Sequence, residues 1–571
     1  MFLCKVTQPS FWASVKNNPK YLPLIEEVRD MWENEAQMPL TALPYSDFIL
    51  FSTTGDRKRY ETPYFKRRRA MNGAAIMALL YPEDEQYIRR LEDIIFAICD
   101  EYTWCVPAHQ PPVDTVITDH IDLFASETGF ALCEIDYLLG DRLAPLVRNR
   151  ITARLEERIV APFLDESRDF VWYHIKNNWA AVCLQGVAGV IMYRHPELFW
   201  KLKPRFDISM NCFLSSFGDD GFCTEGIGYW RYGFGFFTVY ADMVRKFTKG
   251  EIDLFTLPKV KNIATFKQKM FLSDRASVSF ADGQRTATGD YAMGHYLKKE
   301  YPDEVQLTNL EGAKGTDHCG RWCLHIRSFE WFDENEPITP LPDAATYYGE
   351  NAQWMIFKTA DFGFAGKAGH NEEAHNHNDV GHFILAAGGE QVFADLGAGL
   401  YNKPYFRLPF RYQNIYCASF GHSVPLFGKG ATDYDKICQK VGEEHRATEV
   451  EHSDSHFAFE MAGAYDDARV EKAHRRFTFA KDAVTLEDSF KVEEGLRICE
   501  RFVLLKNPKI LENGFTVGPF ACKVHGKIKS IDVTRVDGME HDGVTLLPIY
   551  LTDVILDENE RQFKLEISYQ K

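Results

Sequence analysis

The sequence predicts a two-part protein, an incomplete (α/α) toroid followed by an antiparallel β-sandwich. Apolar residues recur at helical spacing from about Trp32 to Phe332, and no strand-like runs alternate with them. A segment rich in proline and acidic residues, 333–342, follows and has the composition of a linker. Beyond it the apolar runs become short and rich in Val, Ile, Phe and Thr. We therefore expect domains at residues 1–335 and 336–571.

The helices of the first part are predicted from apolar steps of three and four residues. One helix is expected at 81–102, where Ile88, Leu91, Ile94 and Ile98 share a face and an acidic first turn precedes them. Further helices are expected at 119–139, 141–162, 179–193 and 226–249. Because the connectors are short and no repeat of fixed period is present, we expect stacked helical hairpins in an arc or toroid.

The strands of the second part lie between turn residues. They are expected at 354–357, 383–387, 456–461, 483–490 and 498–505. Gly388 and Gly389 would form a two-residue hairpin turn, so that Ala387 faces Glu390. Counting back from this turn places His382 opposite Asp395.

Composition excludes several classes of protein. The 571 residues include 45% hydrophobic and 14% aromatic residues, too many for a disordered chain. The formal net charge of -17 argues against nucleic-acid binding, which needs a basic face, but it does not exclude a local basic cleft for an anionic sugar polymer.

The expected location is the cytoplasm. The N-terminal residues are too polar for a signal peptide, and no apolar run is long enough for a membrane span. The 13 cysteines are odd in number and irregularly spaced, as expected of reduced buried thiols. The sequence leaves the oligomeric state open, a homo-oligomer included.

The first candidate site is Asn177-Asn178-Trp179, at the start of a helix rich in small residues. Asparagine at a helix start is commonly a cap. A cap needs only one asparagine, so the second amide is available to donate hydrogen bonds to a substrate carboxylate.

The second candidate site is aromatic and glycine-rich. Asp219-Asp220-Gly221-Phe222 precedes Glu225, and Tyr229-Trp230-Arg231-Tyr232 follows. Such residues also pack helix starts, but sugar sites use them because aromatic faces stack on pyranose rings while Arg and Tyr reach the polar edges.

The third candidate site is a histidine-rich loop. His370, His375, His377 and His382 fall within thirteen residues, and His422 follows later in Gly421-His422-Ser423. His377, Asp395 and His422 form a His/Asp/His set, which is ligand chemistry that zinc favours. His382 is a rival ligand or a partner of one, because the hairpin register brings it to Asp395.

These three sites, in this order, resemble the heparinase II/III group of polysaccharide lyases. The matching stretches are NNW, DGF with EGIGYWRYG, HNHNDVGHF with GGEQVFADLG, and GHS. The resemblance covers the organisation of nearly the whole chain and implies a toroid with a β-sandwich. It further implies β-elimination of uronic-acid polysaccharides, with glycosaminoglycans such as heparan sulfate, hyaluronan or chondroitin first and oligoalginate second.

The resemblance also implies residue roles. Asn178, with Asn177 as the alternative, would neutralise the uronate carboxylate. Tyr232, with Tyr229 as the close alternative, would act at the scissile bond, and His375 would be the partner base or the acid–base residue for the other epimer. His377, Asp395 and His422 would hold one mainly structural divalent metal, zinc in preference to manganese or calcium. The remaining substrate contacts are expected from Trp179, Glu225, Trp230, Arg231, Tyr401 and Tyr405.

One departure from the family affects these roles. Several relatives have histidine where this chain has Trp179, so that role is lost or moves to Glu225 or His375. Two alternatives from other classes stay open. A glycoside hydrolase would use Asp220 and Glu225 as its carboxylate pair, and a non-catalytic glycan-binding protein would keep the aromatic residues and the metal.

Overall fold

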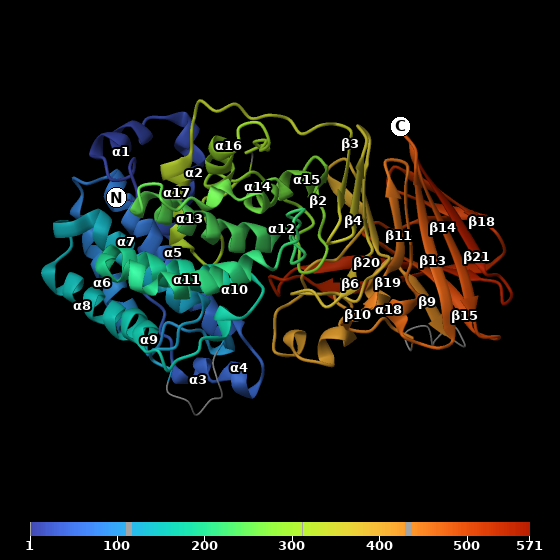
Figure 1. Cartoon of the computed structure of the whole chain (residues 1–571), viewed down its shortest axis with the longest axis horizontal. Helices are drawn as coiled ribbons and strands as arrows, with labels where there is room; N and C mark the ends of the chain where they lie inside the picture. The colour runs from blue at the N-terminus through green and yellow to red at the C-terminus, as the bar shows by residue number, and fades with distance from the viewer. Residues whose placement is uncertain (1, 110–116, 311, 429–436, 571) are drawn as a thin grey trace. The chain divides into compact units, whose positions relative to one another are not determined.

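The structure is a computed structural model that describes residues 2–109, 117–310, 312–428 and 437–570 (Figure 1). The chain packs into two compact units. The helical unit comprises Met1–Ser216, Trp230–Lys261 and Thr288–Pro340. The sandwich unit comprises Phe217–Tyr229, Asn262–Ala287 and Leu341–Lys571. A change of unit at residues 340 and 341 lies beside the expected boundary, but a single boundary does not describe the two earlier segments of the sandwich unit.

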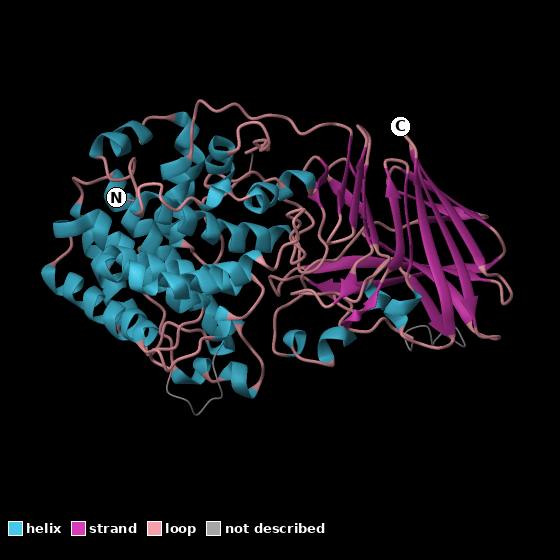
Figure 2. Ribbon diagram, in the orientation of Figure 1, coloured by secondary structure: helices cyan, strands magenta, loops and turns pink. Residues whose placement is uncertain are grey.

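The helical unit is built of α-helices joined by connectors of varied length (Figure 2). Its helices include α1 (Pro9–Val15), α2 (Leu22–Met31), α3 (Tyr45–Phe48), α4 (Leu50–Thr53), α5 (Lys58–Leu80), α6 (Glu85–Cys99), α7 (Leu123–Leu139), α8 (Pro145–Leu155), α9 (Ala161–Leu164), α10 (Asn178–Arg194), α11 (Phe199–Leu214), α13 (Gly235–Phe247), α16 (Met293–Glu300) and α17 (Trp322–Trp331). Among the described residues, none of the chain's helices has both the length and the hydropathy that crossing a membrane requires.

The predicted helices appear with ends that differ by a few residues. The helix expected at 81–102 is α6, which begins where the Asp84 side chain accepts a hydrogen bond from Gln86 N at 3.1 Å. The single helix expected at 226–249 is instead divided into α12 (Ile227–Tyr229), a π-helical turn η8 (Trp230–Phe234) and α13. This division matters for function, because Tyr229 and Tyr232 fall in different units.

Small residues let α10 pack closely against α7. A Cβ atom on Gly186 would lie 2.6 Å from the carbonyl oxygen of Ser126, and one on Gly189 would lie 2.4 Å from the Phe130 ring. Only glycine fits such distances. The small-residue run therefore sets the position of the α10 N-terminus, where Asn178 stands.

The sandwich unit contains two large antiparallel sheets. The first has the order β19-β20-β15-β8-β7-β5-β4-β3, with β9 also paired to β15. Its strands are β3 (Ala345–Gly349), β4 (Trp354–Lys358), β5 (Gly363–Lys367), β7 (Phe383–Ala387), β8 (Glu390–Phe393), β9 (Pro425–Gly428), β15 (Arg497–Leu504), β19 (Ile528–Met539) and β20 (Leu546–Leu556).

The second sheet has the order β11-β12-β13-β14-β21-β18-β17-β16. Its strands are β11 (Thr448–Ser453), β12 (His456–Glu460), β13 (Val470–Phe479), β14 (Ala483–Val492), β16 (Lys509–Leu511), β17 (Gly514–Val517), β18 (Phe520–His525) and β21 (Gln562–Tyr569). Short pairs β1 (Phe271–Ser273) with β2 (Ala276–Ser277), and β6 (His370–Asn371) with β10 (Gly442–Arg446), complete the unit.

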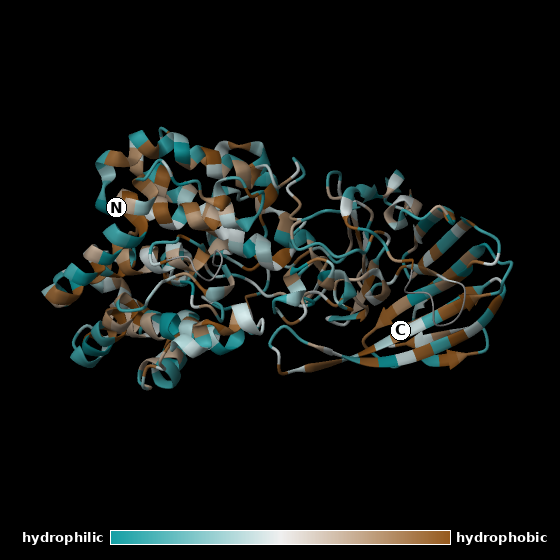
Figure 3. Cartoon of the chain, turned by 90° about the horizontal axis from the view of Figure 1, so that it is seen from below, coloured by the Kyte–Doolittle hydropathy of each residue, from teal (hydrophilic) through white to brown (hydrophobic). Residues whose placement is uncertain are grey.

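Aromatic side chains fill the space between the two sheets. Phe364 of β5 and Phe383 of β7 meet Phe477 of β13 with ring centroids 4.9 and 5.3 Å apart. Buried and exposed positions alternate along β14, and hydrophobic and hydrophilic bands alternate along the sandwich strands in Figure 3. This packing is that of a sandwich.

The β7–β8 hairpin follows the predicted turn. Ala387 pairs with Glu390, and Gly388 and Gly389 have φ angles of 60° and 80°. A bulge then shifts the register between Leu385 and Ala386. The hairpin nevertheless brings His382 to Asp395, as described below.

Candidate active site and metal centre

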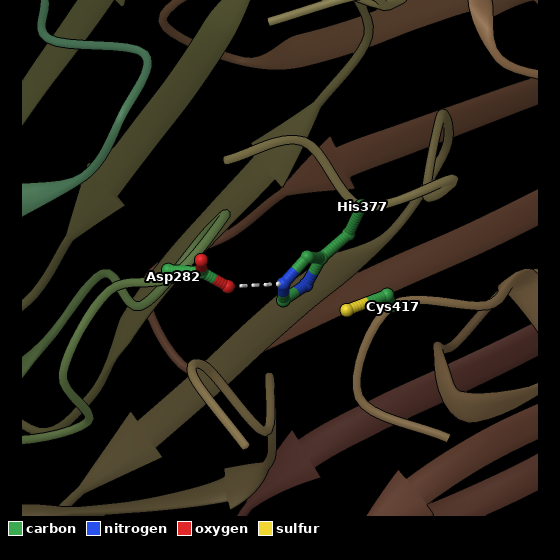
Figure 4. Close-up of side chains that lie close together, drawn as sticks. All are labelled: Asp282, His377 and Cys417. Atoms are coloured by element: carbon green, nitrogen blue, oxygen red, sulfur yellow. Dashed lines mark hydrogen bonds and ion pairs between the residues drawn. The ribbon is translucent and has the colours of Figure 1, made fainter. Parts of the chain in front are cut away.

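A buried carboxylate, Asp282, is the centre of the site in the sandwich unit. Its Oδ2 atom lies 2.7 Å from Nδ1 of His375 and accepts a hydrogen bond from the Tyr401 hydroxyl at 2.8 Å. Its Oδ1 atom lies 3.1 Å from Nε2 of His377, shown as a dashed line in Figure 4, and accepts a hydrogen bond from the Tyr405 hydroxyl. One side chain therefore orders two histidines and two tyrosines.

Asp282 is charged in this setting. Burial alone would raise its pKa, but the Arg411 guanidinium, 3.5 Å from Oδ1, and hydrogen bonds from His375 and His377 hold that pKa well below its usual value. A carboxylate that accepts Nδ1–H of His375 leaves the Nε2 lone pair of that ring available as a base.

His375 is held in an unusual conformation. Its φ angle is 61°, in the left-handed region that residues other than glycine rarely adopt. The imidazole stacks on the Tyr229 ring, with centroids 4.0 Å apart and planes 20° apart, and 17% of the side chain is exposed. Its Nε2 atom lies 3.9 Å from Glu225 Oε2. The backbone strain and the stacked ring together fix the direction of the available nitrogen.

Tyrosine hydroxyls connect Tyr229 to the same carboxylate. The hydroxyl groups of Tyr229 and Tyr401 are 2.8 Å apart, and Tyr401 donates to Asp282. Burial, and then the charge of Asp282, raise the pKa of Tyr401 well above its usual value, so Tyr401 stays protonated. Since Tyr401 gives its proton to Asp282, its oxygen accepts from Tyr229.

The sandwich unit thus brings together five of the residues expected from the sequence: Glu225, Tyr229, His375, Tyr401 and Tyr405. The Tyr405 hydroxyl donates to Asp282, so this side chain supports the carboxylate, and its expected contact with substrate stays a prediction. Asp282 itself was missed by the sequence analysis. Its only local signal is the Asp282-Gly283 pair, which is typical of any turn.

The two asparagines at the start of α10 have different roles: one caps the helix and the other is buried. Asn177 caps α10, since its side-chain oxygen accepts the Trp179 N–H at 2.9 Å. Asn178 is buried at the first position of that helix. A Cβ atom on Gly233 would lie 3.1 Å from the Asn178 Cβ, so glycine at this position lets η8 approach the start of α10.

Tyr232, the tyrosine favoured by the sequence, has a different environment from Tyr229. Its hydroxyl donates to Glu127 of α7, and the Arg321 guanidinium lies 3.8 Å from its ring centroid. Burial, followed by the charge of Glu127, raises the pKa of Tyr232 well above its usual value. Both hydroxyl groups have a partner, Glu127 for Tyr232 and Tyr401 for Tyr229, but only Tyr229 stacks on the candidate base His375. We therefore favour Tyr229.

Two other expected contacts of the helical unit have structural partners, and their contact with substrate stays a prediction. Trp230 is buried, and its ring packs against Phe234 with centroids 5.7 Å apart. Arg231 is only partly exposed, and its guanidinium pairs with the buried carboxylate of Asp290. Both side chains therefore hold the helical packing around η8.

Glu127 predicts a pH dependence of stability. Burial raises its pKa from 4.5 to about 7, although Arg321 opposes this. The folded state therefore binds this proton more tightly than the unfolded state, and the contribution of Glu127 to stability declines as the pH rises from 4.5 to about 7. Glu127→Gln is expected to remove up to roughly 3 kcal/mol of this decline, measured by denaturant unfolding at about pH 5 and about pH 8. Equal pH slopes for the variant and the wild type would contradict the assignment.

His377, Asp395 and His422 form a fully buried group whose ligand atoms lie within 4.8 Å of one another. His422 Nδ1 bonds the Ala418 carbonyl at 2.8 Å, which leaves its Nε2 with a lone pair. That atom lies 3.3 Å from Nδ1 of His377, whose Nε2 bonds Asp282. Burial opposes the charge of His377, but Cys417 and Asp282 outweigh it and raise the pKa of His377 to about 10, so without an ion Nδ1 donates to His422 Nε2. A cation between the two nitrogens would take the place of this proton. Zinc–nitrogen bonds of about 2.0–2.1 Å in a tetrahedron place two nitrogens at about this separation.

Asp395 completes this group. Its Oδ2 atom lies 3.9 Å from His422 Nε2 and makes no hydrogen bond within the described part of the chain. Burial lowers the pKa of His422 to about 4, so that imidazole is neutral, as a metal ligand must be. These donors fit a zinc ion.

His382 supports Asp395 instead of competing with it. Its Nδ1 atom accepts the Ser423 N–H at 2.8 Å, so its proton is on Nε2, which lies 3.3 Å from Asp395 Oδ2. Cys417, with Asp282 and His377, forms a second close group (Figure 4). Asp282 already accepts bonds from His375, Tyr401 and Tyr405, so the His377, Asp395 and His422 set suits a metal better. All thirteen cysteines are free, as expected.

The helical unit and the antiparallel sandwich define a fold shared with a heparinase and two glycosaminoglycan lyases. Heparinase III has a TM-score of 0.60 at 12% identity, over 90% of this chain and 78% of that one. Heparan sulfate lyase HepC from Pedobacter heparinus has a TM-score of 0.57 at 12% identity, over 99% of this chain and 88% of that one. The Streptomyces coelicolor A3 chondroitin AC lyase in complex with chondroitin sulphate has a TM-score of 0.59 at 10% identity, over 99% of this chain and 82% of that one. The predicted fold class, an incomplete toroid with a β-sandwich, is confirmed.

A family model matches the C-terminal part of the chain. Residues 342–552 match the family described as heparinase II/III-like, C-terminal, so this part of the chain is similar to that family. The stated resemblance is therefore confirmed. No curated protein sequence matches the chain.

Proposed function

We propose that this protein is a polysaccharide lyase that cleaves glycans containing uronic acid by β-elimination and leaves an unsaturated uronate. Glycosaminoglycan fragments such as heparan sulfate, hyaluronan or chondroitin are the first substrate class, and oligoalginate is the second. The observation that carries the proposal is the Tyr229, Tyr401, Asp282 and His375 arrangement. The names of the similar structures, a heparinase, a heparan sulfate lyase and a chondroitin lyase, support it.

The reaction needs one proton acceptor and one proton donor. His375 Nε2 takes the C5 proton, because Asp282 fixes the ring tautomer and stabilises the imidazolium that forms. The electrons of the C5–H bond form the C4–C5 double bond as the C4–O bond breaks. The Tyr229 hydroxyl gives its proton to the leaving oxygen, and the donor role of Tyr229 follows from its stacking on His375. Asn178 is proposed to donate hydrogen bonds to the uronate carboxylate.

We also propose one structural zinc ion on His377, Asp395 and His422. Two imidazole nitrogens favour zinc over calcium, which prefers oxygen ligands, and the closed setting argues for a structural ion. When bound, the ion would accept the lone pairs of the buried ligand atoms and fix the position of the His377 side chain. His377 bonds Asp282 and lies two residues after His375 in the same loop. Fixing His377 would therefore also fix the loop that carries His375.

The metal proposal predicts stoichiometry and stability. Purified protein should contain one zinc ion per chain by elemental analysis, and His422→Ala should lose it together with several kcal/mol of stability. His370→Ala is the matched control, because His370 lies in the same loop but is partly exposed and pairs with Glu373. Full metal content in His422→Ala, or none in the wild type, would contradict the proposed site.

The structure disfavours the glycoside hydrolase alternative. Asp220, one of its two carboxylates, accepts the backbone N–H groups of Phe222 and Asn351 at 3.0 and 2.8 Å. Such bonds are those of a turn-forming aspartate and not of a catalytic acid. A non-catalytic role would leave the oriented base His375 without a purpose.

The test is ultraviolet absorbance during incubation with heparan sulfate, hyaluronan, chondroitin and alginate oligosaccharides in parallel. Only elimination creates a conjugated double bond, so absorbance should rise with at least one substrate, and the pattern names the class. Release of reducing ends without absorbance would indicate a hydrolase, and binding without turnover would indicate a glycan-binding protein. Either result would overturn the proposal.

A further inference from the structure

The helical unit contains a second histidine that is oriented by a buried carboxylate. His109 Nδ1 lies 2.8 Å from Oδ2 of Asp122, whose side chain is fully buried. The ring stacks on Phe124 with centroids 5.4 Å apart and planes 6° apart. His375 is built in the same way, with a buried aspartate on Nδ1 and an aromatic ring against its face. The sequence analysis singled out His375 but not His109.

Asp122 fixes the proton of His109. Its Oδ1 atom accepts the Ala125 N–H at 2.7 Å, which caps α7, and its Oδ2 atom accepts the Val106 N–H at 3.4 Å and faces the imidazole. A carboxylate can only accept, so Nδ1 carries the proton and Nε2 carries the lone pair. Within the described residues, Nε2 has no hydrogen-bond partner, and 12% of the side chain is exposed.

His109 also lies beside residues expected to contact substrate. Its ring centroid is 4.7 Å from that of Trp179, which directly follows Asn178 at the start of α10. Trp179 is half-buried, so part of the residue is accessible. An aromatic face with an adjacent hydrogen-bond acceptor is how proteins recognise a sugar ring and one of its polar groups.

We propose that His109 and Trp179 form a sugar-binding subsite, in which a pyranose ring lies on Trp179 and one of its hydroxyl groups donates a hydrogen bond to His109 Nε2. The subsite rests on the proposed function, since it assigns a further contact to the same polysaccharide. His109 is a binding and specificity residue in this account and takes no part in proton transfer. The structural alternative is that His109 only covers the Asp122 cap.

The test is steady-state kinetics of the full chain on the oligosaccharide that gives the fastest absorbance rise. His109→Phe keeps the ring packing but removes the acceptor, so KM should rise about 10-fold, the loss of one hydrogen bond to substrate, while kcat stays within about twofold. His109→Gln offers an amide oxygen near the position of Nε2 and should recover most of the lost affinity.

A matched control is available in the same unit. His174 Nε2 lies 2.8 Å from Asp169, but both side chains are mostly exposed, so His174→Phe should leave KM and kcat unchanged. If His109→Phe melts below the assay temperature, His109→Met replaces it with the same expected result. An unchanged KM in a folded His109 variant would overturn the subsite and leave the capping role.

The subsite and the proposed function can fail separately. If the wild type shows no elimination on any substrate, the proposed function fails. Calorimetric binding of the same oligosaccharides to the wild type and His109→Phe then decides the subsite. About tenfold weaker binding by the variant supports it, and equal binding, or no binding to either protein, overturns it.

Discussion

Tyr229→Phe is expected to lower kcat about 10³-fold, because it removes one hydroxyl and with it the proton donor for the leaving oxygen. The ring remains, so its stacking on His375 should persist, and the variant should fold and bind zinc like the wild type. KM should change little, since the missing hydroxyl acts mainly in the transition state. The measurement is the initial rate of absorbance increase over a range of substrate concentrations.

Tyr232→Phe is the comparison that decides between the two tyrosines. Its hydroxyl serves Glu127, so its loss should lower kcat less than about tenfold, and a change in stability should be the larger effect. If Tyr232→Phe abolishes turnover and Tyr229→Phe does not, the assignment of the proton donor reverses.

Asp282→Asn is expected to have the second large effect, a fall in kcat of about 10⁴-fold. The amide donates where His375 needs an acceptor, so the ring turns to the other tautomer and Nε2 loses its lone pair. The buried Arg411 also loses its counter-charge, and stability should fall by about 3–5 kcal/mol. Activity and thermal unfolding should be measured on the same preparation, at a temperature where the variant is folded.

A variant of another buried carboxylate distinguishes the loss of kcat from the loss of stability. Glu134 is fully buried and pairs with Arg327 at 3.0 Å in the helical unit. Glu134→Gln should destabilise the protein to a similar degree while kcat stays near the wild-type value. Equal losses of kcat in the two variants would show that Asp282 acts through stability alone.

Local patterns predicted much of the fold. The apolar steps of residues 88–98 gave a helix because its buried face is one stripe of an amphipathic helix. The two-residue turn at Gly388 and Gly389 fixed a hairpin, and with it the approach of His382 to Asp395 despite a bulge. These features depend on neighbours in sequence, which is why they are visible in the sequence alone.

The centre of the site depends on distant residues and was not predictable in this way. Asp282 is 93 positions from His375 and lies in a segment that joins the sandwich unit from within the helical part of the sequence. No periodicity connects the two. Tyr229 and Tyr232 are only three residues apart, and the π-helical turn that begins at Trp230 gives them different partners. A motif could name the pair but could not choose between them.

The roles of the two asparagines were partly visible. One cap per helix start is a local rule, and Asn177 fills it, which leaves the buried Asn178 as the candidate for the substrate carboxylate. His109 had no signal at all, because its pairing with Asp122 and its packing on Trp179 arise only from helix packing.

The central claim is cleavage by elimination, and the most direct test is cleavage in water enriched in heavy oxygen, followed by mass spectrometry of both new chain ends. Elimination takes no oxygen from water, so both products should be unlabelled, and one should be lighter than the hydrolysis product by one molecule of water. Heavy oxygen in a new reducing end, with no product of the lower mass, would contradict the account.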